Sequence, residues 1–208
     1  MREVDPKSTT RAMSYELYID APMPMVTLFK PLDVTGLVRL SKKGHKFNML
    51  LCWCAAAAAQ RVEEFQLLPV GKALIEYDSV AVNVIVEDKR GELVSCDLPF
   101  SHDWREFEKS YLELTGRAYE TGQAHELPEA MILGTSSLAK FEIDGAVNFY
   151  SGIFNNPFLI WGKYIRKGLK KQLKVSFQFH HVQMDGQQAC RFLEYMQEEI
   201  FRLGKATG

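Results

Sequence analysis

Residues 173–186 read LKVSFQFHHVQMDG and hold two patterns in succession. The first seven residues alternate between apolar and polar side chains, which is the period of a half-buried β-strand. The pair Asp185-Gly186 is typical of a tight turn, and Gln187–Leu203 has the character of a helix. The stretch therefore predicts a strand, a turn and a helix, with His180 and His181 at the end of the strand.

The two histidines are adjacent, and adjacent residues of an extended segment point to opposite faces. We therefore expect one of His180 and His181 to pack inward and the other to point into a cleft. A neutral imidazole is a suitable general base near neutral pH. The alternative is a purely structural histidine, which is the commoner role of this residue type.

The rest of the chain mixes strand pairs with single helices. After a short helix or irregular lead-in at 8–18, the sequence predicts helices at 35–40, 48–64 and 104–121, and strands at 25–32, 72–77, 80–87, 92–98, 130–141, 145–150 and 158–165. A regular βαβ alternation is absent, so we expect an α+β fold with a mixed β-sheet. No repeat, low-complexity segment or linker divides the chain, which predicts a single domain over residues 1–208.

Composition and charge exclude several classes of function. The formal net charge of the 208 residues is −1, which gives no electrostatic basis for binding nucleic acid or an anionic membrane. No apolar run approaches the roughly 20 residues of a membrane span. The first six residues contain no apolar core of a secretory signal, so we expect a cytoplasmic protein.

The cysteines and the remaining histidines do not form a metal-binding pattern. The cysteines are Cys52, Cys54, Cys96 and Cys190, and we interpret them as buried, reduced thiols. A zinc site is the competing interpretation of the histidine pair. The other histidines, His45, His102 and His125, are not spaced four residues from another histidine, so we expect no metal.

Several segments together resemble one family. His180-His181-x-x-x-Asp185-Gly186 resembles the active-site signature of chloramphenicol acetyltransferases, which the catalytic domains of dihydrolipoamide acyltransferases share more loosely. Further segments resemble that family in the same order: Arg11–Tyr18, Lys46-Phe47, Tyr77–Val80, Ser136–Leu138 and Gly162–Tyr164. The resemblance covers nearly the whole chain, which makes it far more specific than one short motif.

The resemblance implies a role for each residue of the motif. His181 would be the general base that takes a proton from the acceptor hydroxyl, which then attacks the thioester of acetyl-CoA. Ser136 would donate a hydrogen bond to the oxyanion of the tetrahedral intermediate. Asp185 would pair with Arg11 and support the loop that carries His181. Taken singly, Ser136 could be an ordinary strand hydroxyl, Asp185 a turn residue and Arg11 a surface charge. The order and spacing of these residues together with His181 favour an active site.

The resemblance is weaker in the region that would bind the acceptor. Tyr18 is retained where the family has an aromatic residue of its antibiotic site, but the stretch 19–25 replaces apolar and cysteine pocket residues. Ile160 stands at the position of a threonine that helps to place the acceptor through water, and Lys140 stands at that of a tryptophan. Loss of a hydroxyl alters acceptor preference more than acyl-transfer chemistry. Lys163 would lie near the phosphates of CoA.

The resemblance also implies the architecture and the partners. The family is a two-layer α/β sandwich that forms homotrimers, with the active site between subunits. We therefore expect an acetyl-CoA-dependent O-acetyltransferase of antibiotic resistance, which transfers the acetyl group to a hydroxyl of chloramphenicol. Two alternatives stay open: a related enzyme with another alcohol or amine acceptor, and a non-enzymatic small-molecule binder. A carrier-domain acyltransferase is disfavoured because the chain has no lipoyl domain or flexible linker.

Overall fold

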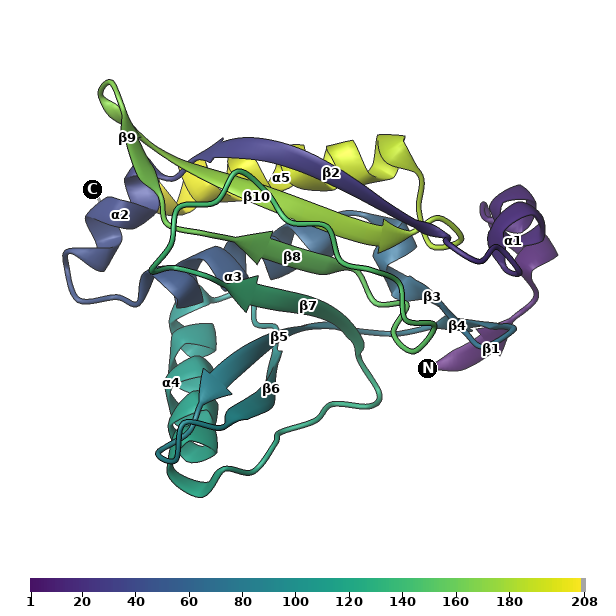
Figure 1. Cartoon of the computed structure of the whole chain (residues 1–208), viewed down its shortest axis with the longest axis horizontal. Helices are drawn as coiled ribbons and strands as arrows, with labels where there is room; N and C mark the ends of the chain where they lie inside the picture. The colour runs from purple at the N-terminus through teal and green to yellow at the C-terminus, as the bar shows by residue number, and fades with distance from the viewer. Residues whose placement is uncertain (207–208) are drawn as a thin grey trace.

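A mixed β-sheet forms the centre of the molecule, as the computed structural model of residues 1–206 shows (Figure 1). Its strand order is β2-β10-β8-β7-β5-β6, and the short β9 pairs with β10. The strands are β2 (Met25–Asp33), β5 (Val80–Glu87), β6 (Leu93–Pro99), β7 (Met131–Ser137), β8 (Phe158–Trp161), β9 (Ile165–Lys167) and β10 (Lys170–His180). The pairs β5–β7 and β7–β8 are parallel and the others are antiparallel. The predicted mixed sheet is confirmed.

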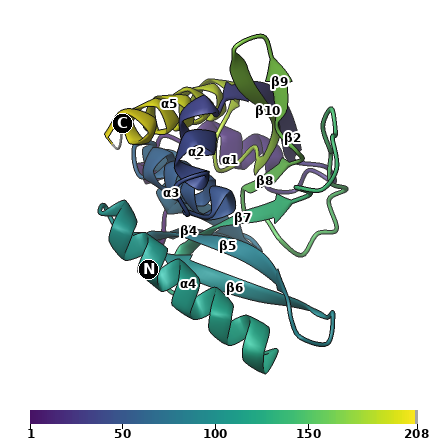
Figure 2. The ribbon, with the colours of Figure 1, turned by 90° about the vertical axis from the view of Figure 1, so that its left-hand side faces the viewer.

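Four helices cover one face of this sheet (Figure 2). They are α2 (Thr35–Ser41), α3 (Phe47–Ala59), α4 (Trp104–Thr121) and α5 (Gly186–Ala206). Every residue of α3 from Met49 to Ala59 is buried, and its run of alanines lets neighbouring elements approach closely. Where α2 meets α5, a Cβ on Gly36 would lie 2.8 Å from the Cα of Gly204. The arrangement is the expected α+β fold in two layers.

A smaller unit lies beyond the end of β10 (Figure 1). It contains a three-stranded antiparallel sheet and three short helical segments. These are β1 (Arg2–Val4), β3 (Leu67–Val70) and β4 (Ala73–Glu76), with α1 (Ala12–Tyr18) and the 3₁₀ helices Pro6–Ser8 and Glu63–Gln66. Val182, from the turn after β10, packs with Leu67 and Leu74 of this sheet and with Tyr15 and Tyr18 of α1. This packing fixes the turn that carries the histidine pair.

The predicted strand at 145–150 is wrong. Both edges of β10 are already occupied by β2 and β8, so this segment cannot pair with β10. The segment instead crosses the face without helices (Figure 1), where side chains of β10 hold it. Ser176 Oγ accepts from Ala146 N at 2.9 Å, and Gln178 Nε2 donates to the carbonyl of Asn148 at 2.9 Å.

Other element boundaries also differ from the prediction. The helix expected at 48–64 ends at Ala59, the strand expected at 130–141 ends at Ser137, and the strand expected at 158–165 is divided into β8 and β9. The strands β1 and β3 were not expected. Cys52, Cys54 and Cys96 are buried and free, but Cys190 is exposed, against the prediction. None of the described helices is both long enough and apolar enough to span a membrane.

Candidate active site

His180 is the buried member of the histidine pair. It is the last residue of β10, and its side chain is 2% exposed. Burial, with a smaller contribution from the neighbouring His181, lowers the pKa of His180 to about 4. Its Nδ1 accepts a hydrogen bond from the backbone N–H of Val182 at 3.1 Å. His180 is therefore neutral at pH 7 and holds the turn that follows it.

His181 is half-buried and its ring lies flat against Tyr18. The two ring centroids are 4.1 Å apart and the planes differ by 9°. The backbone N–H of His181 donates to the carbonyl of Pro24 at 2.8 Å, which ties the turn to the segment before β2. Its Nδ1 is buried and has no hydrogen-bond partner within residues 1–206. Stacking on Tyr18 therefore sets the orientation of this imidazole.

The Arg11 side chain binds the turn that carries the histidine pair. Its side chain is almost fully buried, and its Nε donates to the carbonyl of Val182 at 2.9 Å. One terminal nitrogen, Nη2, donates to the carbonyl of His181 and to Ser14 Oγ, both at 2.9 Å. Its ion pair with Asp185 is longer, at 3.5 Å, and the Asp185 side chain is 40% exposed. The carbonyl contacts are therefore the stronger part of this arrangement.

Asp185 has a second contact that explains its place before Gly186. Its Oδ1 accepts from the backbone N–H of Gln187 at 3.0 Å, in the first turn of α5. The carboxylate thus satisfies one of the unpaired donors at the start of a helix. Asp185 links this helix start to Arg11 and so to the turn between β10 and α5.

Ser136 lies on a different part of the sheet. It pairs with Ile160 of β8, and Ile160 pairs with Ser176 of β10. From Ser176, His180 is four residues further along β10, about 13 Å at roughly 3.3 Å per residue. Two strand spacings add about 10 Å across the sheet. Within one chain, therefore, Ser136 and His181 do not meet, whereas Arg11, Tyr18, His181 and Asp185 do.

Lys163 and Lys140 are both exposed surface residues in this structure. Lys163 follows β8, and its backbone N–H donates to the carbonyl of Phe141 at 2.6 Å. This contact joins the segment after β7 to the segment after β8. Lys163 thus lies near the end of β7 that carries Ser136, away from the turn that carries His181.

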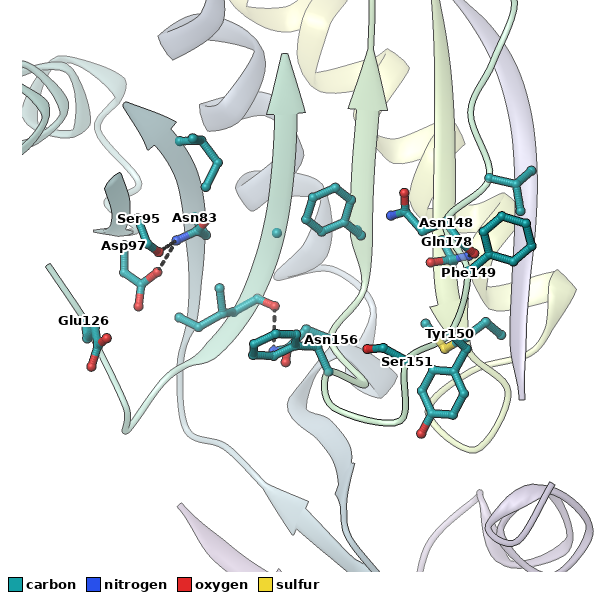
Figure 3. A pocket seen from close by; sticks show the side chains of 17 residues that line it. Asn83, Ser95, Asp97, Glu126, Asn148, Phe149, Tyr150, Ser151, Asn156 and Gln178 are labelled. Atoms are coloured by element: carbon teal, nitrogen blue, oxygen red, sulfur yellow. Dashed lines mark hydrogen bonds between the residues drawn. The ribbon is translucent and has the colours of Figure 1, made fainter. Parts of the chain in front are cut away.

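A hollow of about 820 Å³ opens on the face of the sheet that lacks helices. Its floor includes Gly134 of β7 and Phe158 of β8, which precede Ser136 and Ile160 by two residues on the same strands. Because side chains two apart share a face of a strand, the hollow is adjacent to Ser136. Figure 3 shows polar side chains at both ends of the hollow, with Asp97 and Glu126 at one end and Gln178 toward the other.

A sequence profile described as chloramphenicol acetyltransferase matches residues 2–197. The chain belongs to this family. As a member of the chloramphenicol acetyltransferase family, the protein is an acyltransferase, and the family implies a CoA-based acyl donor. Among residues 1–206, no group of three or more His, Cys, Asp or Glu side chains could hold a metal ion.

Individual relatives extend over nearly the whole chain. Chloramphenicol acetyltransferase 2 of Escherichia coli is 28% identical over 207 residues, covering 93% of this chain and 94% of the relative. A solved chloramphenicol acetyltransferase superposes with a TM-score of 0.82 at 14% identity, covering 96% of this chain and 100% of its own. The cubic core of a pyruvate dehydrogenase multienzyme complex superposes with a TM-score of 0.66 at 17% identity, covering 96% of this chain and 91% of its own.

The residues of the hollow were missed by the sequence analysis, although a signal for them exists. Asn83 of β5 lies between the buried Val82 and Val84. Asp97 of β6 lies between the buried Cys96 and Leu98. Gln178 is a polar position in the alternating pattern of β10, as Ser176 is. Polar side chains in such positions mark a sheet face that the helices do not cover. For this acetyltransferase family member, they mark the surface next to Ser136.

Proposed function

We propose that this protein is an acetyl-CoA-dependent O-acetyltransferase in which His181 is the general base. One observation carries the proposal: the imidazole of His181 is stacked on Tyr18 while buried Arg11 binds the carbonyl of the same residue. A structural histidine needs neither restraint. A base that must present its ring in one orientation needs both.

The chemistry follows from the position of a neutral imidazole. His181 takes the proton of the acceptor hydroxyl as that oxygen bonds to the acetyl carbonyl carbon. The C–S bond then breaks, the acetyl group stays on the acceptor, and the proton passes to the CoA sulfur. Ser136 donates its hydroxyl hydrogen to the carbonyl oxygen as negative charge develops there. One such preorganised donor is worth roughly 3–4 kcal/mol of barrier.

We further propose that each site uses two chains, with His181 from one and Ser136 from its neighbour in a homotrimer. The separation of these two residues within one chain supports this arrangement. Support also comes from the exposed apolar side chains of the segment across the open face: Val147, Phe149, Ile153 and Phe154. Phe149 alone is 93% exposed, which is unusual for a side chain that is not covered by a partner.

The remaining candidate residues have binding roles in this proposal. Tyr18 restrains His181 and lines the acceptor side. Ile160, next to Ser136 in the sheet, contacts the acceptor without a hydrogen bond. Lys163 offers an ammonium group to the phosphates of CoA. Chloramphenicol is the first acceptor to test because the relatives of this chain carry that name.

The test is an assay of thiol release from acetyl-CoA in the presence of chloramphenicol. We expect release by the wild-type protein and a fall of at least about a hundredfold in His181→Ala, which lacks the base. His102→Ala is the matched control, because His102 is an exposed histidine outside the site. Equal thiol release by wild type and His181→Ala would contradict the assignment of the base.

A different acceptor is the second candidate, and the hollow beside Ser136 favours it. Several polar side chains line this hollow. Ile160, which pairs with Ser136 in the sheet, has no side-chain group that could form a hydrogen bond. A panel of alcohols and amines, assayed with the same thiol reagent, separates the two candidates. Chloramphenicol as by far the best acceptor of the panel would exclude the second.

A further inference from the structure

The floor of the hollow is a single row of residues in register across the sheet. Asp97 pairs with Asn83, Asn83 with Gly134, and Gly134 with Phe158. Gln178 of β10 completes the row by pairing with Phe158. The row crosses β6, β5, β7, β8 and β10, so the hollow is a groove that runs perpendicular to the strands.

The middle of this groove is aromatic. A Cβ on Gly134 would lie 2.3 Å from Cδ2 of Phe158, so the ring of Phe158 lies over the glycine backbone. Only a residue without a side chain permits this position. Ser136 lies two residues along β7 on the same face, about 7 Å away. A planar group that rests on Phe158 would therefore lie beside the Ser136 hydroxyl.

One end of the groove carries negative charge. Asp97 is 7% exposed, and its Oδ1 and Oδ2 accept from Asn83 Nδ2 at 2.7 Å and from the backbone N–H of Leu127 at 2.9 Å. Glu126 lies at the same end of the groove (Figure 3). A carboxylate has about four acceptor positions, so Asp97 can accept further hydrogen bonds.

No positive side chain balances these carboxylates inside the groove. The residues that line it include Asp97 and Glu126 but no Lys, Arg or His. The lining also lies partly below the surface, where charges are screened less than in bulk water. The groove therefore has a negative potential at one end and an aromatic surface in the middle.

We propose that the acceptor of this enzyme is a cationic alcohol, with an ammonium group bound at Asp97 and Glu126 and a hydroxyl group presented beside Ser136. Asp97 lies two strands from Gly134, about 10 Å at roughly 4.8 Å per strand. The two groups of the acceptor are therefore separated by a rigid spacer, which the Phe158 ring contacts. This inference rests on the proposed acetyltransferase function.

The test compares two acceptors that differ in charge at one end. One is chloramphenicol, and the other is its analogue in which an aminomethyl group replaces the para nitro group. Both keep the same hydroxyl group for acetylation. We expect kcat/KM of the wild-type enzyme to be about tenfold higher for the cationic analogue, the effect of one hydrogen bond to a charged group.

Substitutions of Asp97 and Glu126 then test whether the preference for the cationic analogue depends on these carboxylates. In Glu126→Gln and Asp97→Asn, the ratio of kcat/KM between the two acceptors should fall toward one. Glu129→Gln is the matched control, because Glu129 is an exposed carboxylate of the same loop outside the groove. Glu126 is exposed, so its replacement tests the proposal even if Asp97→Asn does not fold. An equal or lower kcat/KM for the cationic analogue, or a ratio unchanged in Glu126→Gln, would overturn the proposal.

Binding measurements separate this inference from the proposed function. If neither acceptor supports thiol release, the acetyltransferase proposal fails, and the affinities of both molecules are measured by calorimetry on the same proteins. Tighter binding of the cationic analogue that is reduced about tenfold in Glu126→Gln would support the cation site alone. Equal affinities, or no binding of either molecule, would overturn it.

Discussion

The guanidinium of Arg11 holds the backbone carbonyl of His181 at 2.9 Å, although the two residues are 170 positions apart. The same side chain binds the carbonyl of Val182. Both acceptors belong to the turn after β10, which has no sheet partner of its own. The position of the candidate base therefore depends on an N-terminal residue that is buried beneath it.

Replacing Arg11 should cost more stability than replacing its acidic partner. Arg11→Ala leaves two buried carbonyls without a donor, for which we expect a loss of about 2–4 kcal/mol in the free energy of unfolding. Asp185→Asn keeps an acceptor for Gln187 and loses only a long, partly exposed ion pair, for which we expect less than about 1 kcal/mol. Urea unfolding of both variants measures the difference. Equal losses would show that the ion pair, and not the carbonyl contacts, holds the turn.

The Tyr18 ring should matter for activity more than its hydroxyl. Tyr18→Phe keeps the stacked ring against His181, so we expect thiol release near the wild-type rate. Tyr18→Ala removes the stack, which is worth about 0.5–1.5 kcal/mol, and we expect kcat/KM to fall by roughly tenfold. Steady-state kinetics of both variants test this. A loss of the same size in Tyr18→Phe would assign the effect to the hydroxyl.

His180 should make the fold sensitive to acid. Its pKa is lowered from 6.5 to about 4 by burial, so the unfolded chain binds a proton on His180 at a pH where the folded chain does not. The contribution of His180 is therefore fully present above pH 6.5 and is lost as the pH falls from 6.5 toward 4, by up to about 3 kcal/mol.

The variant His180→Asn tests this pH dependence, because its side-chain oxygen can replace Nδ1 as the acceptor for Val182 N–H. Unfolding free energies at several pH values between 4 and 7 should show a shallower slope in the variant. An identical slope would mean that other groups cause the acid sensitivity.

Two helical glycines should respond in opposite directions to alanine. In Gly36→Ala the new Cβ meets the backbone of Gly204 at 2.8 Å, so α2 and α5 must separate and stability falls. In Gly116→Ala the Cβ meets nothing within 4 Å, and the higher helix propensity of alanine should add about 0.5–1 kcal/mol. Thermal unfolding of both variants measures the contrast. Stabilisation by both changes would contradict the close helix contact.

The elements with strong local patterns could be predicted from the sequence. The alternation before His180 correctly predicted the strand β10, and the apolar run at 48–59 correctly predicted most of the helix α3. The error at 145–150 has a different origin, because its alternation is real but the sheet has no free edge beside β10. Which strand edges are occupied depends on the whole topology, and a local pattern does not contain that information.

The candidate site could likewise be predicted only in part. The motif and the resemblance named Arg11, Tyr18 and His181, and the structure brings these three together. The charged groove was not predicted, because Asp97 lies in a strand and Glu126 in a loop about 30 residues later. A β-bridge between Cys96 and His125 brings the strand and the loop together. The separation of Ser136 from His181 also depends on strand order, which the sequence pattern leaves open.

In the proposed homotrimer, His181 of one chain and Ser136 of its neighbour form one acetyl-transfer site. Ser136→Ala and His181→Ala should each be nearly inactive alone, because one lacks the oxyanion donor and the other the base. When the two variants are unfolded together and refolded as mixed oligomers, thiol release should return to roughly one quarter of the wild-type rate, since random mixing restores that share of intact sites. Mixed oligomers no more active than the separate variants would rule out a site shared between two chains.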